Sequence, residues 1–183
     1  MQKSSRHSKI TGDFAESLIL YWLSKSGWEC ARVDHTGIDI IAADKDGKKR
    51  IGISVQGRSR LANVEHDSLN LHDFEKARDA CKSFACEPHS ALVIDAGSVI
   101  RCFMISLDHL EKIATGKLGG KRYWQMTDKF LQKYKDDPEI KKFELTHKNL
   151  NWPTFEVSEP LPRQRRLPSI KSRIESGTST NSA

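Results

Sequence analysis

The order of apolar patterns along the chain predicts a mixed α/β domain, in which helices flank a β-sheet. Helical and strand-like segments follow one another as helix, three strands, helix, two strands and helix, the mixed order of such folds. The chain has 183 residues, which suits a single domain with extra segments. Its 37% hydrophobic and 30% charged residues are typical of a globular protein and exclude collagen-like and coiled-coil classes.

The first half of the chain predicts a helix and then three strands. Asp13 is a suitable N-cap with Glu16 three residues later, apolar side chains recur at helical spacing up to Trp22, and Gly27 marks the end. Strand patterns follow over residues 28–33, 37–43 and 51–58. The polar, glycine-containing segment 44–50 joins the last two strands as a hairpin.

The second half predicts shorter elements. A helix is expected over residues 73–84, strands over 90–95 and 99–106, and a helix capped by Ser106 or Asp108. Residues 124–140 form a weaker helical pattern, and residues 143–145 resemble a short strand.

The net charge divides the chain into three parts. The formal charge is +6, and residues 1–10 and 158–183 each carry +3, so the central part is neutral. We expect a flexible basic N-terminus (1–10), one α/β domain (11–157) and a disordered basic tail (158–183) that is poor in large apolar residues. The basic segments favour an anionic partner such as DNA.

The sequence pattern predicts neither a transmembrane segment nor a zinc finger. The longest apolar run, residues 18–23, is far shorter than the roughly 20 residues that a bilayer requires. Four cysteines show neither a C-x-x-C pair nor a histidine at finger spacing. Reduced thiols of a cytoplasmic protein are the expected state.

Polar side chains gather in the predicted hairpin. Ser54, Gln56 and Arg58 share one face of a strand because side chains alternate, and Asp39 lies in the neighbouring strand. Asp39 has isoleucines on both sides, where an unpartnered buried acid would be costly, and this favours a functional role. Glu16 can join the group from the preceding helix, although it can also serve only as the partner of Asp13 in a helix cap.

This arrangement resembles the PD-(D/E)XK nuclease-like superfamily of restriction endonucleases and Holliday-junction resolvases. The resemblance covers roughly residues 11–107 and depends on Glu16, on Gly-Ile-Asp-Ile at 37–40 and on Gly-Ile-Ser-Val-Gln-Gly-Arg at 52–58. It implies a restriction-endonuclease-like mixed sheet flanked by helices, and a site in which acids hold Mg²⁺ and a lysine supports attack on DNA. Asp39 and Glu16 are the implied metal ligands.

The chain departs from the family pattern at two positions. Aligned directly, Ser54 replaces the second acid and Gln56 replaces the lysine. In a second alignment, Gln56 serves as a ligand through its amide oxygen and Arg58 replaces the lysine, supplying charge but no general base. Glu65 is a further candidate for the replaced acid.

Three functions follow from these observations. The first is a Mg²⁺-dependent DNA endonuclease with Glu16, Asp39, Gln56 and Arg58 in the active site; the others are a catalytically degraded DNA-binding relative and a protein-interaction module, and a homodimer is possible. Tyr123, Trp124 and Trp152 are expected to pack in the core rather than stack on bases. The expected DNA contacts are Lys48, Lys49, Arg50, Arg58 and Arg60.

Overall fold

The computed structural model describes residues 5–59, 68–70, 74–96, 99–118 and 121–146. The helices are α1 (Ser5–Lys25), α2 (Phe74–Ser83), α3 (Leu107–Ile113) and α4 (Asp128–Lys135). The first five strands are β1 (Glu29–His35), β2 (Ile38–Ala43), β3 (Arg50–Ser59), β4 (Ser68–Asn70) and β5 (Glu87–Asp95). The remaining strands are β6 (Val99–Ser106), β7 (Thr115–Leu118), β8 (Lys121–Gln125) and β9 (Lys141–Thr146).

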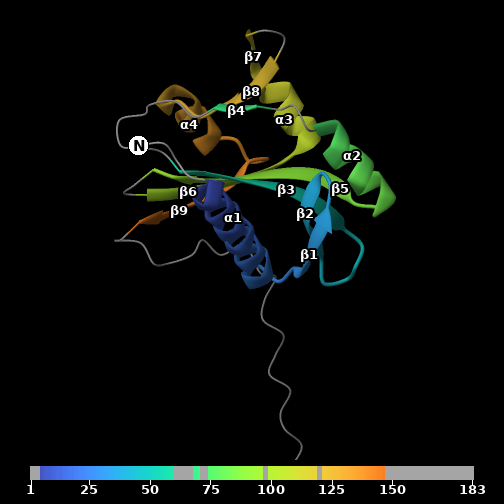
Figure 1. Cartoon of the computed structure of the whole chain (residues 1–183). Coiled ribbons are helices and arrows are strands. Elements are labelled where there is room, and N and C mark those ends of the chain that lie inside the picture. The colour runs from blue at the N-terminus through green and yellow to red at the C-terminus, as the bar shows by residue number, and fades with distance from the viewer. Residues whose placement is uncertain (1–4, 60–67, 71–73, 97–98, 119–120, 147–183) are drawn as a thin grey trace, which may run out of the picture.

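A six-stranded mixed sheet forms the centre of the fold. Its strand order is β1-β2-β3-β5-β6-β9, and only the β3–β5 pair is parallel. Helix α1 lies on one face, while α2, α3, α4 and a small sheet of order β4-β8-β7 lie on the other (Figure 1). The predicted fold class, a mixed α/β sheet flanked by helices, is confirmed.

Two apolar cores fill the space on either side of this sheet. Under α1, Trp22 and Ile19 pack on Ile40 and Ile53 of the sheet. On the other face, residues of α2 and α3 pack with buried side chains of β5, β6 and β8, among them Leu92, Phe103 and Trp124. Because successive side chains of a strand point to opposite faces, a sheet covered on both sides needs apolar residues at nearly every central position.

Helix α1 begins earlier than predicted. It starts at Ser5, and the Thr11 hydroxyl donates to the carbonyl of His7 within the helix. Asp13 lies inside the helix, where its carbonyl accepts from the Ser17 hydroxyl, so the expected N-cap at Asp13 is wrong. Once a helix is nucleated, each added residue gains a hydrogen bond, so polar residues upstream extend it at little cost. The division into domain and tails stays a prediction, and residues 147–183, which include the expected tail and Trp152, lie outside the described residues.

The region after α3 also differs from the prediction. Ser106 does cap α3 by accepting from the backbone N–H of His109. The expected helix over 124–140 is reduced to α4, since Trp124 belongs to strand β8 and pairs with Leu69 of β4. Trp124 is fully buried against Phe103, which confirms its expected packing role. Pairing with a strand distant in sequence overrides local helical preference here.

The helices that the structure describes include none with the length and apolar character of a membrane span. The four cysteines are free thiols, with Cys81 and Cys102 buried. Burial raises the pKa of the Cys81 thiol to about 11, so this thiol stays protonated at neutral pH.

Candidate functional site

The candidate site lies where strands β2 and β3 separate. Their pairing ends at Ile40 and Ile53, whereas β3 continues beside β5 as far as Ser59. At this point Asp39 Oδ2 accepts a hydrogen bond from the backbone N–H of Val55 at 2.6 Å. The carboxylate therefore satisfies a strand N–H at the point where the β2–β3 ladder stops.

Asp39 lies at a break in the side-chain alternation of β2. Ile38 packs in the core under α2 and α3, whereas Ile40, two residues later, packs in the core under α1. Two residues apart in a regular strand point to the same face, so the backbone turns between them. This turn directs the Asp39 side chain sideways toward β3, where it meets Val55.

Burial sets the protonation behaviour of Asp39. The side chain is half-buried, and loss of hydration raises the pKa of its carboxyl, an effect that the Val55 hydrogen bond opposes. The Val55 N–H holds the Asp39 carboxylate in place, but its negative charge is only partly balanced. It is suited to bind a cation.

Glu16 is the second acid of the site. Burial raises the pKa of its carboxyl, and the negative charge of Asp39 raises it further, as does that of Asp13, while Arg32 acts in the opposite direction. The effect of the Asp39 charge on Glu16 indicates that α1 brings the two carboxyls near each other. The alternative role of Glu16 as a capping partner of Asp13 is wrong because the helix begins at Ser5.

Arg32 is a residue that sequence reasoning did not select. It lies on β1, where its guanidinium donates to the Ser17 hydroxyl at 2.5 Å and to the Asp13 carbonyl at 3.2 Å. These contacts hold a cation beside Glu16 and tie the edge strand to α1. The alternation of Cys30 and Arg32, which places them on one face of the strand, was the available signal.

Gln56 and Arg58 lie on the other side of β3. A Cβ placed on Gly57 would meet the backbone oxygen of Thr11 at 2.5 Å, so this position faces α1 and its neighbours face away. Arg58 Nη2 donates to Gln56 Oε1 at 3.2 Å, and Arg58 Nη1 donates to the Gly57 carbonyl at 3.1 Å. The expected four-residue group is therefore divided: Asp39 joins Glu16, whereas Gln56 pairs with Arg58.

The expected DNA contacts are also divided. Lys48 pairs with Asp46 at 3.5 Å and Lys49 with Glu87 at 3.6 Å, both in or near the β2–β3 turn. Arg50 begins β3, and Arg58 is close to its other end, roughly 26 Å away at 3.3 Å per residue. Val55, which binds Asp39, is five residues from Arg50, so the turn cations lie roughly 16 Å along β3 from this acid. Arg60 and Glu65 are outside the described residues.

Two carboxylates are available to a metal ion at this site. Within the residues that the structure describes, no group of three or more His, Cys, Asp or Glu side chains is placed to hold one. Mg²⁺ is nevertheless commonly bound by one or two protein carboxylates, with water and substrate phosphates completing its ligands. The pair Asp39 and Glu16, whose mutual repulsion a cation would relieve, fits that chemistry.

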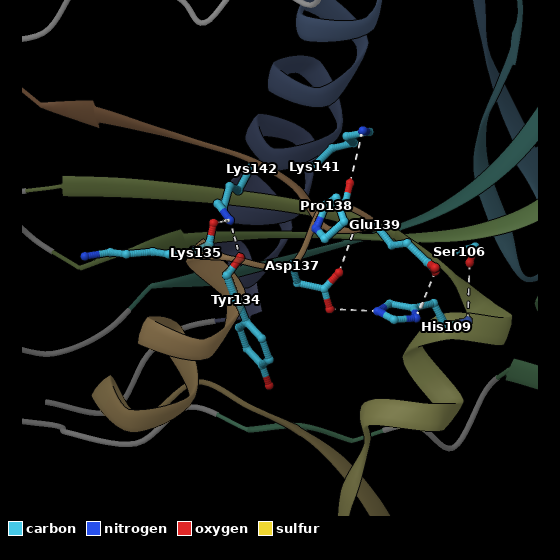
Figure 2. Close-up of polar contacts among 9 residues, drawn as sticks. All are labelled: Ser106, His109, Tyr134, Lys135, Asp137, Pro138, Glu139, Lys141 and Lys142. Carbon is cyan, nitrogen blue, oxygen red and sulfur yellow. Dashed lines mark hydrogen bonds and ion pairs between the residues drawn. The ribbon is translucent and has the colours of Figure 1, made fainter.

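A second polar cluster lies on the opposite face of the sheet (Figure 2). His109 of α3 faces Asp137 through Nε2 at 2.8 Å and Glu139 through Nδ1 at 2.9 Å. Lys142 of β9 donates to the carbonyls of Tyr134 and Lys135 at the end of α4. Among the described residues, His109, Asp137 and Glu139 do not form a group that could hold a metal ion. The cluster joins α3 to the segment between α4 and β9.

Comparisons with known proteins find a likeness among solved structures. No family model matches the chain, and no curated protein matches it. Among solved structures, the chain is similar to Hjc, a Holliday junction resolvase from the archaeal hyperthermophile Archaeoglobus fulgidus. The identity is 18%, the TM-score is 0.45, and the match covers 65% of this chain and 85% of that one.

Proposed function

We propose that this chain is a nuclease-fold protein that hydrolyses phosphodiester bonds of DNA with the help of a divalent metal ion. The observation that carries the proposal is the pair of carboxylates at the separation of β2 and β3, in which the charge of Asp39 raises the pKa of Glu16. Two acids held close together repel each other, and Arg32 offsets this repulsion at Glu16 only in part, so a bound cation would stabilise the pair. Mg²⁺ is the cation that such oxygen ligands and a phosphate substrate favour.

Each residue has a defined part in this proposal. Asp39 and Glu16 hold the metal, and the Val55 N–H fixes the Asp39 carboxylate so that it needs no rearrangement. When bound, Mg²⁺ would polarise the phosphoryl group and lower the pKa of a water molecule. Arg58 is exposed and held against Gln56 on the face of β3 away from α1, which suits it to contact a phosphate beside the reacting one. Gln56 is an auxiliary group that orients Arg58.

The test is cleavage of supercoiled, linear and branched DNA with Mg²⁺ or Mn²⁺. We expect activity that Asp39→Asn and Glu16→Gln each reduce by at least about 100-fold, as loss of a group that stabilises transition-state charge does. Asp79→Asn is the matched control because Asp79 is an exposed acid of α2 on the other face. Cleavage that persists unchanged in Asp39→Asn would disprove the assignment of the site.

A second function, DNA binding without cleavage, is favoured by one observation. Gln56 occupies the position of the family's lysine, and its amide oxygen accepts from Arg58. In that case the wild type binds DNA in a strongly salt-dependent manner but does not cut it. The double variant Ser54→Glu, Gln56→Lys distinguishes the two functions. Cleavage gained by this variant, against none in the wild type, identifies a degraded enzyme.

A further inference from the structure

A groove runs between α1 and the edge strand β1, next to the two acids. Its volume is about 870 Å³. The helix contributes one wall and the strand the other, with the main lining side chains Ser17, Tyr21, Ser24, Trp28, Cys30 and Arg32. Since β1 is an edge strand of the sheet, no further strand among the described residues closes the groove on its outer side.

The groove carries a cation at each end. Arg32 lies at the end next to the acids, where its charge acts on Glu16. Lys45 lies at the other end, with its side chain across Gly27, where a Cβ would meet Lys45 Cε at 3.2 Å. Gly27 has a φ of 86° and leaves room for this side chain.

Aromatic rings stand between the two cations. Tyr21 is 49% exposed, an unusual state for a large ring, and Trp28 is half-buried at the base of the strand wall. Burial raises the pKa of the Cys30 thiol to about 11, so Cys30 adds no negative charge to that wall at neutral pH. The acid that lines the groove, Glu29, is exposed at its margin. Cations with rings between them form the pattern that binds a single nucleic-acid strand.

We propose that this groove binds single-stranded DNA and directs the strand toward Asp39 and Glu16. This inference rests on the proposed function and specifies its substrate as DNA with an unpaired segment. The strand wall from Glu29 to Arg32 is roughly 10 Å long at 3.3 Å per residue, so the groove holds a short stretch of DNA. Bases stack on Tyr21 and Trp28, while phosphates contact Arg32 and Lys45.

The first experiment measures binding of a fluorescein-labelled oligothymidine by anisotropy, with the intact chain and without metal. Tyr21→Ala is expected to weaken binding by about 5- to 100-fold, the effect of losing one stacked base, whereas Tyr21→Phe keeps the wild-type affinity. Phe14→Ala is the matched control, because Phe14 is 44% exposed on the same helix but does not line the groove.

The second experiment tests the charges of the groove. Lys45→Ala is expected to lower the slope of log affinity against log salt by about 0.7, the value for one phosphate contact of a single strand. Lys112→Ala, which removes an exposed lysine of α3, leaves the slope unchanged. Glu29→Gln strengthens binding because it removes a like charge from the path of the phosphates. Circular dichroism checks that each variant is folded.

The outcomes separate this proposal from the proposed function. Unchanged oligothymidine affinity in both Tyr21→Ala and Lys45→Ala, or no binding by the wild type at low salt, overturns the groove assignment whether or not DNA is cut. A Tyr21→Ala variant with unchanged affinity but a different oligomeric mass shows that the groove is a protein interface instead. Asp39→Asn keeps the oligothymidine affinity, since Asp39 does not line the groove. Loss of cleavage in that variant therefore leaves the groove result intact.

Discussion

The hydrogen bond between Asp39 and Val55 gives a quantitative prediction about the stability of the site. Asp39→Ala leaves the Val55 N–H without its acceptor at the point where β2 and β3 separate. Asp39→Asn keeps a side-chain oxygen in nearly the same place but removes the negative charge. Comparison of the two variants therefore separates the hydrogen bond from the charge.

The expected difference follows from two opposing effects. A half-buried N–H that loses its partner costs about 1–3 kcal/mol, so Asp39→Ala is expected to be less stable than Asp39→Asn by that amount. Burial raises the pKa of Asp39, so the carboxylate destabilises the folded state above its folded-state pKa and has no such effect below its unfolded value near 3.9. The stability of Asp39→Asn relative to the wild type is therefore higher at pH 7 than at pH 3.

Urea unfolding followed by tryptophan fluorescence measures these differences, with the midpoint and slope recorded for each variant at both pH values. Hydrogen exchange of the Val55 amide adds a local measurement, because only Asp39→Ala is expected to speed it strongly. Equal unfolding midpoints for the two variants, together with unchanged exchange at Val55, would refute the reasoning.

Three further predictions test other parts of the molecule. Gly57→Ala places a Cβ 2.5 Å from the Thr11 backbone oxygen. It is expected to lower the free energy of unfolding, measured by urea titration, by about 1–3 kcal/mol. An unchanged value would mean that α1 does not pack closely on β3 at this position. Glu16→Gln is expected to raise the free energy of unfolding at pH 7 by a few tenths to about 1 kcal/mol, with no gain at pH 3. The reason is that burial and the neighbouring acid raise the pKa of the Glu16 carboxyl. Thermal unfolding that shows a loss of stability at pH 7 contradicts this. Burial acts to raise the pKa of Asp137, but hydrogen bonds from His109 and a backbone N–H outweigh this effect, so the net pKa is lowered. The interaction therefore stabilises the fold above about pH 4, and this stabilisation is lost as the pH falls through the folded-state pKa of Asp137. His109→Leu should therefore destabilise at pH 7 and progressively less below pH 4, and a pH-independent effect in thermal unfolding would count against the pairing.

The candidate site was predictable in part. Asp39 could be selected because an acid flanked by isoleucines is costly to bury without a partner, and Glu16 because it lies on the preceding helix. Alternation also predicted correctly that Ser54, Gln56 and Arg58 share a face. It did not predict which face, because that depends on where α1 packs, and Gly57 shows that α1 covers the opposite one.

Arg32 and the groove beside it required the tertiary structure. Arg32 becomes informative only when β1 is the edge strand and α1 lies over it, which brings the guanidinium to Ser17. Similarly, the cations of the β2–β3 turn appeared close to the acids in sequence but lie near the start of β3, roughly 16 Å from Val55 along the strand. Residues that are close in sequence around a hairpin turn can therefore lie far from residues further along its strands.

The sequence by itself determined the nature and order of the main elements, because apolar periodicity reflects which faces are buried, and a sheet covered on both sides leaves a strong record in strands such as β5 and β6. Local preference failed where a distant partner decided the structure, as at Trp124, whose burial in β8 depends on β4. The break in side-chain alternation at Asp39 likewise depends on tertiary packing. Whether a carboxylate meets a strand N–H, a second acid or a lysine depends on the relative placement of α1, β2 and β3, and this placement minimises the exposed apolar surface of the whole domain. Only the tertiary structure therefore decided that Asp39 and Glu16 act as a pair and that Gln56 and Arg58 form another.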